Sequence, residues 1–168
     1  LWLTVLFLKS NKDILEHINP DYESYNADEK RKLLEQCGVA AMLHDIGKVL
    51  VPAEILNKNG PLNETEWEII KRHPLGGLAM LLDTEIPLFV KKAILHHHED
   101  VNGGGYPMNI EGDSIHPLAR VIKIADAFDA LTSKRPYKDA ISPSEAVRIM
   151  AGTPEKGNGG QNRNNGMK

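Results

Sequence analysis

Apolar residues recur at steps of three and four positions along most of the chain, which is the spacing of one face of an α-helix. No convincing stretch alternates between apolar and polar residues as a half-buried strand does. The pattern therefore predicts an all-α protein. We expect its helices at residues 3–17, 28–45, 63–82, 87–98, 116–132 and 143–151.

Residues that favour helix starts stand at several of these boundaries. Asn63 precedes two glutamates, and Ser142 precedes a proline and a glutamate. Pro87 and Pro117 fall in predicted first turns, where a missing N–H costs nothing. Pro74 lies inside the third predicted helix and disfavours a helical residue before it, so we expect that helix to break or kink there.

The two ends of the chain differ from its middle. The apolar run LWLTVLFL is far shorter than the roughly 20 residues that span a bilayer, and we interpret it as part of an amphipathic helix that begins before Leu1. The alternative is the end of a membrane segment located upstream. Residues 152–168 are rich in glycine and asparagine, so we expect a domain at 1–151 followed by a disordered tail.

Charge and cysteine content exclude some classes of protein. The formal net charge of −3 and the lack of a basic stripe argue against binding to a DNA or RNA duplex. Cys37 is the only cysteine, so the chain has no internal disulfide and no thiolate cluster for a zinc finger. We therefore expect a cytoplasmic protein.

Two long segments, 99–115 and 132–142, show no helical pattern. Loops of this length in a compact domain are usually functional or disordered. The first contains three consecutive glycines, which would let the backbone come close to a ligand.

His44 and Asp45 interrupt an otherwise apolar helix. A buried carboxylate is costly unless a partner compensates its charge. A metal cation is one such partner, and the two oxygens of Asp45 could bridge a pair of cations. Lys48 would share the face of His44 if the helix continued, and its ammonium could then reach a phosphate. The alternative is a helix end with Asp45 and Lys48 in solvent and Gly47 as the cap.

Three histidines stand together in AILHHHEDVNGGGYP, residues 93–107. Adjacent helical residues point about 100° apart, so at most two of the rings can face one centre. His97 and His98 are the candidate ligands, whereas we interpret His96 as a surface residue or a neighbour of the ligands. His73, taken alone, is interpreted as structural. Imidazole with carboxylate suits zinc, iron, manganese, nickel or copper.

Two further acids lie three residues apart in the predicted helix at 116–132. Asp126 and Asp129 share one face of this largely apolar helix, so Asp126 could complete a metal shell. Asp129 could orient a metal-bound water or pair with Arg135. Arg135 and Lys138 offer a compact anion site, because guanidinium suits phosphate. The alternative is an ordinary basic surface loop.

The motifs HDIGK, HP followed by a glycine, HHE, GYP, IADAFDALT and RPYK, in this order, resemble the HD-GYP family within the HD superfamily of metal-dependent phosphohydrolases. The resemblance covers approximately residues 38–150. It implies an HD-domain helical bundle with a GYP-containing loop and an additional loop-helix hairpin. It also implies two divalent metal ions, iron or manganese, and hydrolysis of cyclic dinucleotides by attack of a metal-bridged hydroxide. The expected reaction converts cyclic di-GMP to pGpG or GMP.

The resemblance also implies roles for individual residues. The metal ligands would be His44, Asp45, His73, His97, His98 and Asp126, with Asp45 bridging. Lys48 would act beside the scissile phosphate, and Asp129 beside the attacking water. The nucleotide would be held by Tyr106, Arg135 and Lys138.

Several positions depart from the family pattern. The family has a further histidine ligand upstream of the HD motif, where this chain offers only His17 in different surroundings, so we do not expect a third metal. Asn102 and Asn109 replace an aspartate and a glycine, although asparagine tolerates the left-handed conformation.

These departures leave two other functions open. One is a catalytically impaired receptor that binds cyclic di-GMP and signals through partners. The other is an HD phosphohydrolase that acts on a different nucleotide. In each case we expect fusion to an upstream sensory or receiver domain and no membrane insertion by this segment.

Overall fold

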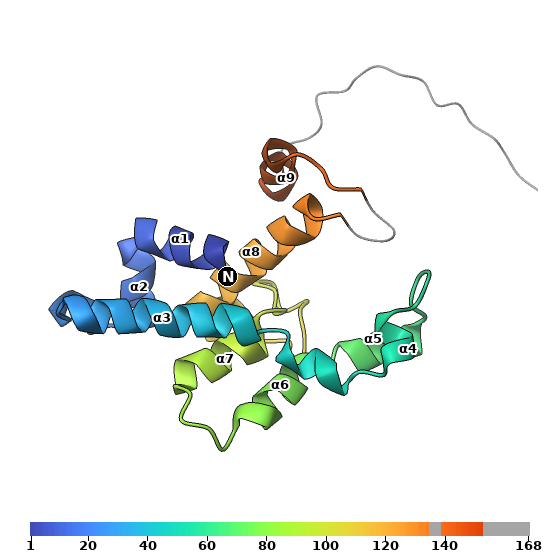
Figure 1. The fold of residues 1–168 in the computed structure, drawn as a ribbon, viewed down its shortest axis with the longest axis horizontal. Helices are drawn as coiled ribbons and strands as arrows, with labels where there is room; N and C mark the ends of the chain where they lie inside the picture. The colour runs from blue at the N-terminus through green and yellow to red at the C-terminus, as the bar shows by residue number, and fades with distance from the viewer. Residues whose placement is uncertain (135–138, 153–168) are drawn as a thin grey trace, which may run out of the picture. The chain divides into compact units, whose positions relative to one another are not determined.

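The computed structural model describes residues 1–134 and 139–152 (Figure 1). Every regular element in these ranges is an α-helix or a short 3-10 helix, which confirms the all-α prediction. The α-helices are α1 (Trp2–Ser10), α2 (Lys12–Ile18), α3 (Ala27–Leu43), α4 (Ala53–Leu56), α5 (Glu64–Ile70), α6 (His73–Leu81), α7 (Leu88–His96), α8 (Pro117–Thr132) and α9 (Pro143–Met150). The 3-10 helices are η1 (Tyr22–Ser24), η2 (Ile46–Leu50) and η3 (Gly112–Ser114).

The chain divides into two compact units, Leu1–Ala127 and Phe128–Lys168. The first unit contains α1 to α7 and the greater part of α8. The second contains the last turn of α8 and α9, and the predicted tail beyond Gly152 lies outside the described residues. The domain boundary expected at residue 151 stays a prediction.

Two of the predicted helices are divided in the structure. The first ends at Asn11, whose Nδ2 donates a hydrogen bond to the Phe7 carbonyl at 2.7 Å and whose φ of −132° leaves the helical region. The third breaks at Lys71, as predicted, and restarts with Pro74 in the first turn of α6. Proline is tolerated there because the first turn of a helix has no intrahelical acceptors for its N–H groups.

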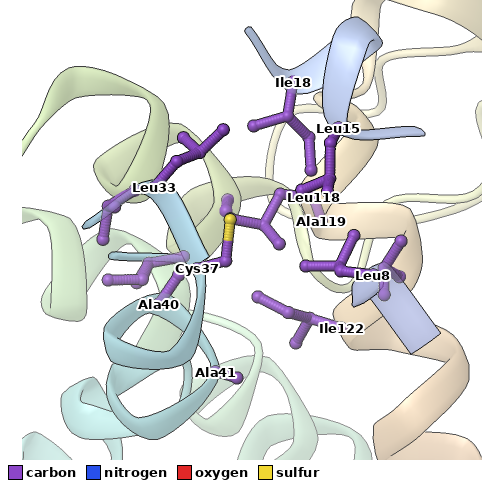
Figure 2. Close-up of a cluster of buried hydrophobic side chains, with 14 of the residues drawn as sticks. Leu8, Leu15, Ile18, Leu33, Cys37, Ala40, Ala41, Leu118, Ala119 and Ile122 are labelled. Carbon is purple, nitrogen blue, oxygen red and sulfur yellow. The ribbon is translucent and has the colours of Figure 1, made fainter. Parts of the chain in front are cut away.

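The core of the first unit is a cluster of mostly aliphatic side chains, contributed mainly by α1, α2, α3, α7 and α8 (Figure 2). α3 packs against α1 and α7. The members of the cluster include Leu8, Leu15, Ile18, Leu33, Cys37, Ala40, Val90, Ala93, Ile94, Leu118, Ala119 and Ile122. Burial raises the pKa of the Cys37 thiol to about 12, so this cysteine is a protonated core residue. Within the described ranges, no helix is both long and apolar enough to cross a bilayer.

Gly47 brings η2 into direct backbone contact with α6. A Cβ at this position would overlap the carbonyl oxygen of His73 and the amide nitrogen of Gly77. Gly47 is therefore a buried contact residue, and its interpretation as an exposed helix cap is wrong. This contact places the residues after α3 beside the first turn of α6.

We expect Gly47→Ala to lower the free energy of unfolding by roughly 1–3 kcal/mol, because the backbone atoms that meet the methyl group have nowhere to move. Urea denaturation measures the change. Gly38→Ala is the matched control in α3, since its methyl would meet only the side-chain ends of Leu1 and Val5 and alanine favours a helix. Equal stability of the two variants would contradict the close backbone contact between Gly47 and α6.

Two histidines hold the start of α8. The Nδ1 atom of His116 accepts a hydrogen bond from the Leu118 amide at 3.2 Å, and Nδ1 of His96 accepts one from the His116 amide at 3.3 Å. The His116 ring also stacks on Phe89. His96 thus supports the backbone at the start of α8, which refines its interpretation as a surface residue or a neighbour of the ligands.

Burial, together with the charges of His96 and Lys92, lowers the pKa of His116 from 6.5 to about 4. Between these values the unfolded chain binds a proton that the folded chain does not. In metal-free protein we therefore expect the free energy of unfolding to fall as the pH drops from 6.5 toward 4. Urea midpoints at several pH values test this. His116→Asn should retain the cap and show a shallower pH slope, and an unchanged slope would refute the assignment.

Candidate metal centre

The ends of three helices bring imidazole and carboxylate groups together. Asp45 follows the C-terminal end of α3, His73 is the first residue of α6, and His97 and His98 follow α7. One nitrogen or oxygen from each of these four residues lies within 4.8 Å of the others. The residues therefore form a compact donor cluster within the first unit.

Backbone contacts fix the proton on three of the rings. Nδ1 of His44, His73 and His97 lies 2.9, 2.7 and 2.7 Å, respectively, from the carbonyl oxygen three residues earlier in the chain. A carbonyl oxygen only accepts, so each Nδ1 carries a hydrogen. In a neutral ring the lone pair is then on Nε2, which is the atom that turns toward the cluster.

These lone pairs face one another at short range. His73 Nε2 lies 3.3 Å from His97 Nε2 and 3.2 Å from Asp45 Oδ1. Three electron-pair donors at these distances repel unless a proton or a metal cation lies among them. Burial lowers the pKa of His97, and burial with the charges of His97 and His73 lowers that of His98 to about 2. Neutral rings favour a metal ion.

The two oxygens of Asp45 face different groups. Oδ1 lies toward His73 and toward His97, whose Nε2 is 3.8 Å away. Oδ2 lies 3.5 Å from His44 Nε2 and 2.6 Å from Lys48 Nζ. Burial alone would raise the pKa of this carboxyl, but its polar neighbours, among them the Lys48 ammonium beside Oδ2, hold it well below its usual range. Asp45 is thus an ionised carboxylate between two sets of donors.

Two buried atoms in the cluster lack hydrogen-bond partners within the described part of the chain. They are His44 Nε2 and Asp45 Oδ1. Asp126 of α8 lies nearby, with Oδ1 3.9 Å from His44 Nε2. Buried polar atoms normally have partners, and here an unpaired imidazole nitrogen faces two carboxylates while an unpaired carboxylate oxygen faces two imidazoles, an arrangement that fits a cation site. The donor set fits divalent metal ions held by imidazole and carboxylate.

Lys48 reaches the cluster by a route that the sequence did not predict. The condition under which Lys48 would share the helix face of His44 is not met, because α3 ends at Leu43 and the chain turns into η2. This turn places the lysine ammonium beside the carboxylate of Asp45. Lys48 therefore neutralises part of the charge of Asp45 while its side chain stays 39% exposed.

The other predicted site residues are Tyr106, Asp129, Arg135 and Lys138. Tyr106 stacks on the ring of His98, with centroids 4.7 Å apart and planes 21° apart. Asp129 lies in the second unit, where its Oδ1 accepts a hydrogen bond from Ser133 Oγ at 3.1 Å. Arg135 and Lys138 lie outside the described residues.

Glu99 holds the glycine-rich loop, a role that sequence reasoning missed. This residue is buried, and its Oε1 accepts a hydrogen bond from the Met108 amide at 2.6 Å. Gly105 lies against the backbone of Glu99 and Asp100, where no Cβ fits. The signal in the sequence was an acid next to the histidine run, at the end of an apolar helix.

Lys123 of α8 fixes the turn that carries His98, and this role was missed as well. Its ammonium donates hydrogen bonds to the carbonyl oxygens of His98 at 3.3 Å and Glu99 at 2.8 Å. It also pairs with the Asp100 carboxylate at 2.6 Å. The signal in the sequence was a lysine within a helix whose other residues are largely apolar.

His17 lies away from this arrangement. Its side chain is exposed on α2, and its Nδ1 contacts the Asp13 carbonyl at 2.6 Å. It does not belong to the donor group found among the described residues. The structure thus gives no metal-binding role to the one upstream histidine.

Comparisons with known proteins agree with this geometry. The model of the family described as HD domain matches residues 21–156, so the chain belongs to the HD domain family, whose fold is all-α. His44 and the four residues of the donor cluster all lie within the matched range.

Curated relatives are similar in sequence to most of this chain. A cyclic di-GMP phosphodiesterase of Pseudomonas aeruginosa is 45% identical over 120 residues, which cover 71% of this chain and 29% of the relative. A cyclic di-GMP phosphodiesterase response regulator of Xanthomonas campestris is 40% identical over 74% of this chain and 32% of its own length. A 3′3′-cGAMP-specific phosphodiesterase of Vibrio cholerae is 40% identical over 67% of this chain and 26% of its own. The chain spans less than a third of the length of these three relatives.

We expect Asp45→Asn to weaken Mn²⁺ binding at least tenfold, about 1.4 kcal/mol, because the amide removes the charge that faces both donor sets. Competition titration with a metal indicator measures the affinity. His17→Ala is the control, since it removes an exposed histidine from α2. Unchanged affinity in Asp45→Asn would contradict the metal centre.

Proposed function

We propose that the chain is an HD-GYP domain that hydrolyses a phosphodiester bond of a cyclic dinucleotide, converting cyclic di-GMP to pGpG or GMP. The observation that carries the proposal is the carboxylate of Asp45, with one oxygen toward His73 and His97 and the other toward His44. The names of the relatives, which specify cyclic di-GMP or 3′3′-cGAMP, support this class of substrate.

The proposed cofactors are two divalent ions, iron or manganese, and Asp45 would contribute a ligand to both. Two groups of donors share this carboxylate, and imidazole with carboxylate suits both metals. His98 joins the group of His73 and His97, and Asp126 the group of His44. When bound, such ions acidify a water molecule and offset the charge of a phosphodiester.

The side chains of the protein then position the scissile phosphate and stabilise its charge. Asp45 stays ionised and is held by the Lys48 ammonium at 2.6 Å. The same ammonium is half-exposed, so it can also bind a non-bridging oxygen of the scissile phosphate. The role of Asp129 beside the attacking water is proposed from the family resemblance alone. Positioning and charge stabilisation account for most of the catalysis of phosphoryl transfer.

A cavity of ≈ 660 Å³ lies beside the cluster, with His98 and Tyr106 in its wall. This volume is within the range of about 300–1,000 Å³ typical of small-molecule sites. We assign the nucleotide to this side of the metal centre, with Tyr106 against it. Arg135 and Lys138 would bind its phosphate groups, because guanidinium and ammonium complement phosphate.

A second candidate is a receptor that binds cyclic di-GMP without hydrolysing it. The observation that favours it is the exposed position of His17, whose ring contacts its own helix. A metal held by fewer imidazoles would be bound less tightly. For either function we propose that this domain follows a sensory or receiver domain, since the relatives are much longer than the chain.

The test is hydrolysis of cyclic di-GMP by protein loaded with Fe²⁺ or Mn²⁺ without air, followed by chromatography of pGpG and GMP. We expect turnover by the unmodified chain. We expect a roughly 100-fold lower kcat in Lys48→Ala, because this variant lacks the ammonium that would stabilise the negative charge of the phosphate. Lys9→Ala, on the exposed side of α1, is the matched control.

Three outcomes separate the candidates. Saturable binding of cyclic di-GMP without product identifies the receptor. Product only from another nucleotide, tested side by side, identifies a different HD phosphohydrolase. Absence of both binding and product with either metal would refute the proposal.

A further inference from the structure

The lining of the cavity beside the cluster includes two groups of residues. One group consists of His98 and Tyr106, which stack on each other. The other group, which we call the outer wall, comes from the segment that runs from α5 into the first turn of α6 and consists of Trp67, Arg72 and Leu75. None of these three residues has a role in the site described above. All of the lining residues belong to the first unit.

Aromatic rings lead from the donor cluster to the outer wall. His98 stacks on Tyr106, and Trp67 meets Tyr106 edge to face, with centroids 6.2 Å apart and planes 77° apart. Trp67 nevertheless remains 45% exposed. An indole ring half exposed in a cavity wall contributes less to the core than its size allows, and its free face can stack on a nucleobase.

The charges of the cavity are unevenly compensated. Lys71 pairs with Glu68, and Lys123 pairs with Asp100. Arg72 also lines the cavity, but it is exposed and makes no ion pair with any residue in the described ranges. Its guanidinium is therefore the cavity cation that is available to an incoming anion. A planar guanidinium suits the oxygens of a phosphate.

We propose that Trp67 and Arg72 form a second subsite, in which Trp67 stacks on a nucleobase and Arg72 binds the phosphate that is not being cleaved. The inference rests on the proposed function, because it assigns the second half of a cyclic dinucleotide. Such a ligand has two bases and two phosphates. The donor cluster takes one phosphate, and the outer wall offers an aromatic face and a cation for the remainder.

The subsite explains how the domain would distinguish a dinucleotide from a mononucleotide. A mononucleotide held at the donor cluster leaves Trp67 and Arg72 without a partner. A cyclic dinucleotide would contact the donor cluster and the outer wall at once, and its rigid ring would lose little freedom on binding. Selectivity then comes mainly from binding at the outer wall.

Steady-state hydrolysis of cyclic di-GMP by the metal-loaded chain tests the subsite. We expect Trp67→Ala to raise KM roughly tenfold or more with a smaller change in kcat, since base stacking is lost. Trp67→Phe should restore most of the affinity because it keeps an aromatic face. Arg72→Ala should raise KM roughly tenfold, as expected for a lost charged hydrogen bond. Trp2→Ala is the control, because the Trp2 side chain on α1 is 77% exposed. An unchanged KM in Trp67→Ala would overturn the inference.

Fluorescence distinguishes failure of the subsite from failure of the proposed function. Trp2 and Trp67 are the only tryptophans, so Trp2→Phe leaves Trp67 as the sole indole. In the Trp2→Phe/Lys48→Ala variant loaded with Mn²⁺, cyclic di-GMP should quench this fluorescence saturably. Quenching in this variant, together with no turnover by the chain that keeps Lys48, supports the subsite and contradicts the hydrolase. Turnover with an unchanged KM in Trp67→Ala and no quenching contradicts the subsite alone. Neither turnover nor quenching refutes both.

Discussion

Repulsion among lone pairs around Asp45 is the constraint on which the rest of the site depends. Backbone carbonyls hold the Nδ1 protons of His44, His73 and His97, so their Nε2 atoms turn toward one another and toward the carboxylate. A folded protein maintains such an arrangement only if a proton or a metal cation relieves it. The same constraint makes Asp45 the centre of the site, because its oxygens face two groups of donors.

The surrounding fold keeps these donors in place with contacts that have no part in the chemistry. Gly47 lets η2 lie directly on α6, which brings Asp45 and His73 together. Lys123 binds the carbonyls of the turn after α7, and Glu99 holds the loop that carries Tyr106. Orientation of ligands by their neighbours is what gives metal sites a defined geometry. The same loop also lines part of the cavity beside the cluster.

The sequence predicted the helices and the chemistry of the donors better than the connections between them. The apolar period predicted α3, α7, α8 and α9 because each buries one face, and Pro74 marked the break before α6. The turn that carries Lys48 to Asp45 could not be predicted, because it depends on a tertiary contact of Gly47. Lys123 and Trp67 were missed for the same reason, since a lysine or a tryptophan in a helix shows its role only beside its neighbours. The roles of Asp129, Arg135 and Lys138 remain predictions from family resemblance.

Anomalous X-ray diffraction from crystals of the Mn²⁺-loaded chain tests the central claim most directly, because it locates each ion without reference to activity. The account predicts two peaks, separated by roughly 3.5–4 Å as in other two-metal sites, one on each side of the Asp45 carboxylate. One peak should lie among His73, His97 and His98, and the other beside His44 and Asp126. Manganese bound elsewhere, with no peak within coordination distance of Asp45, would contradict it.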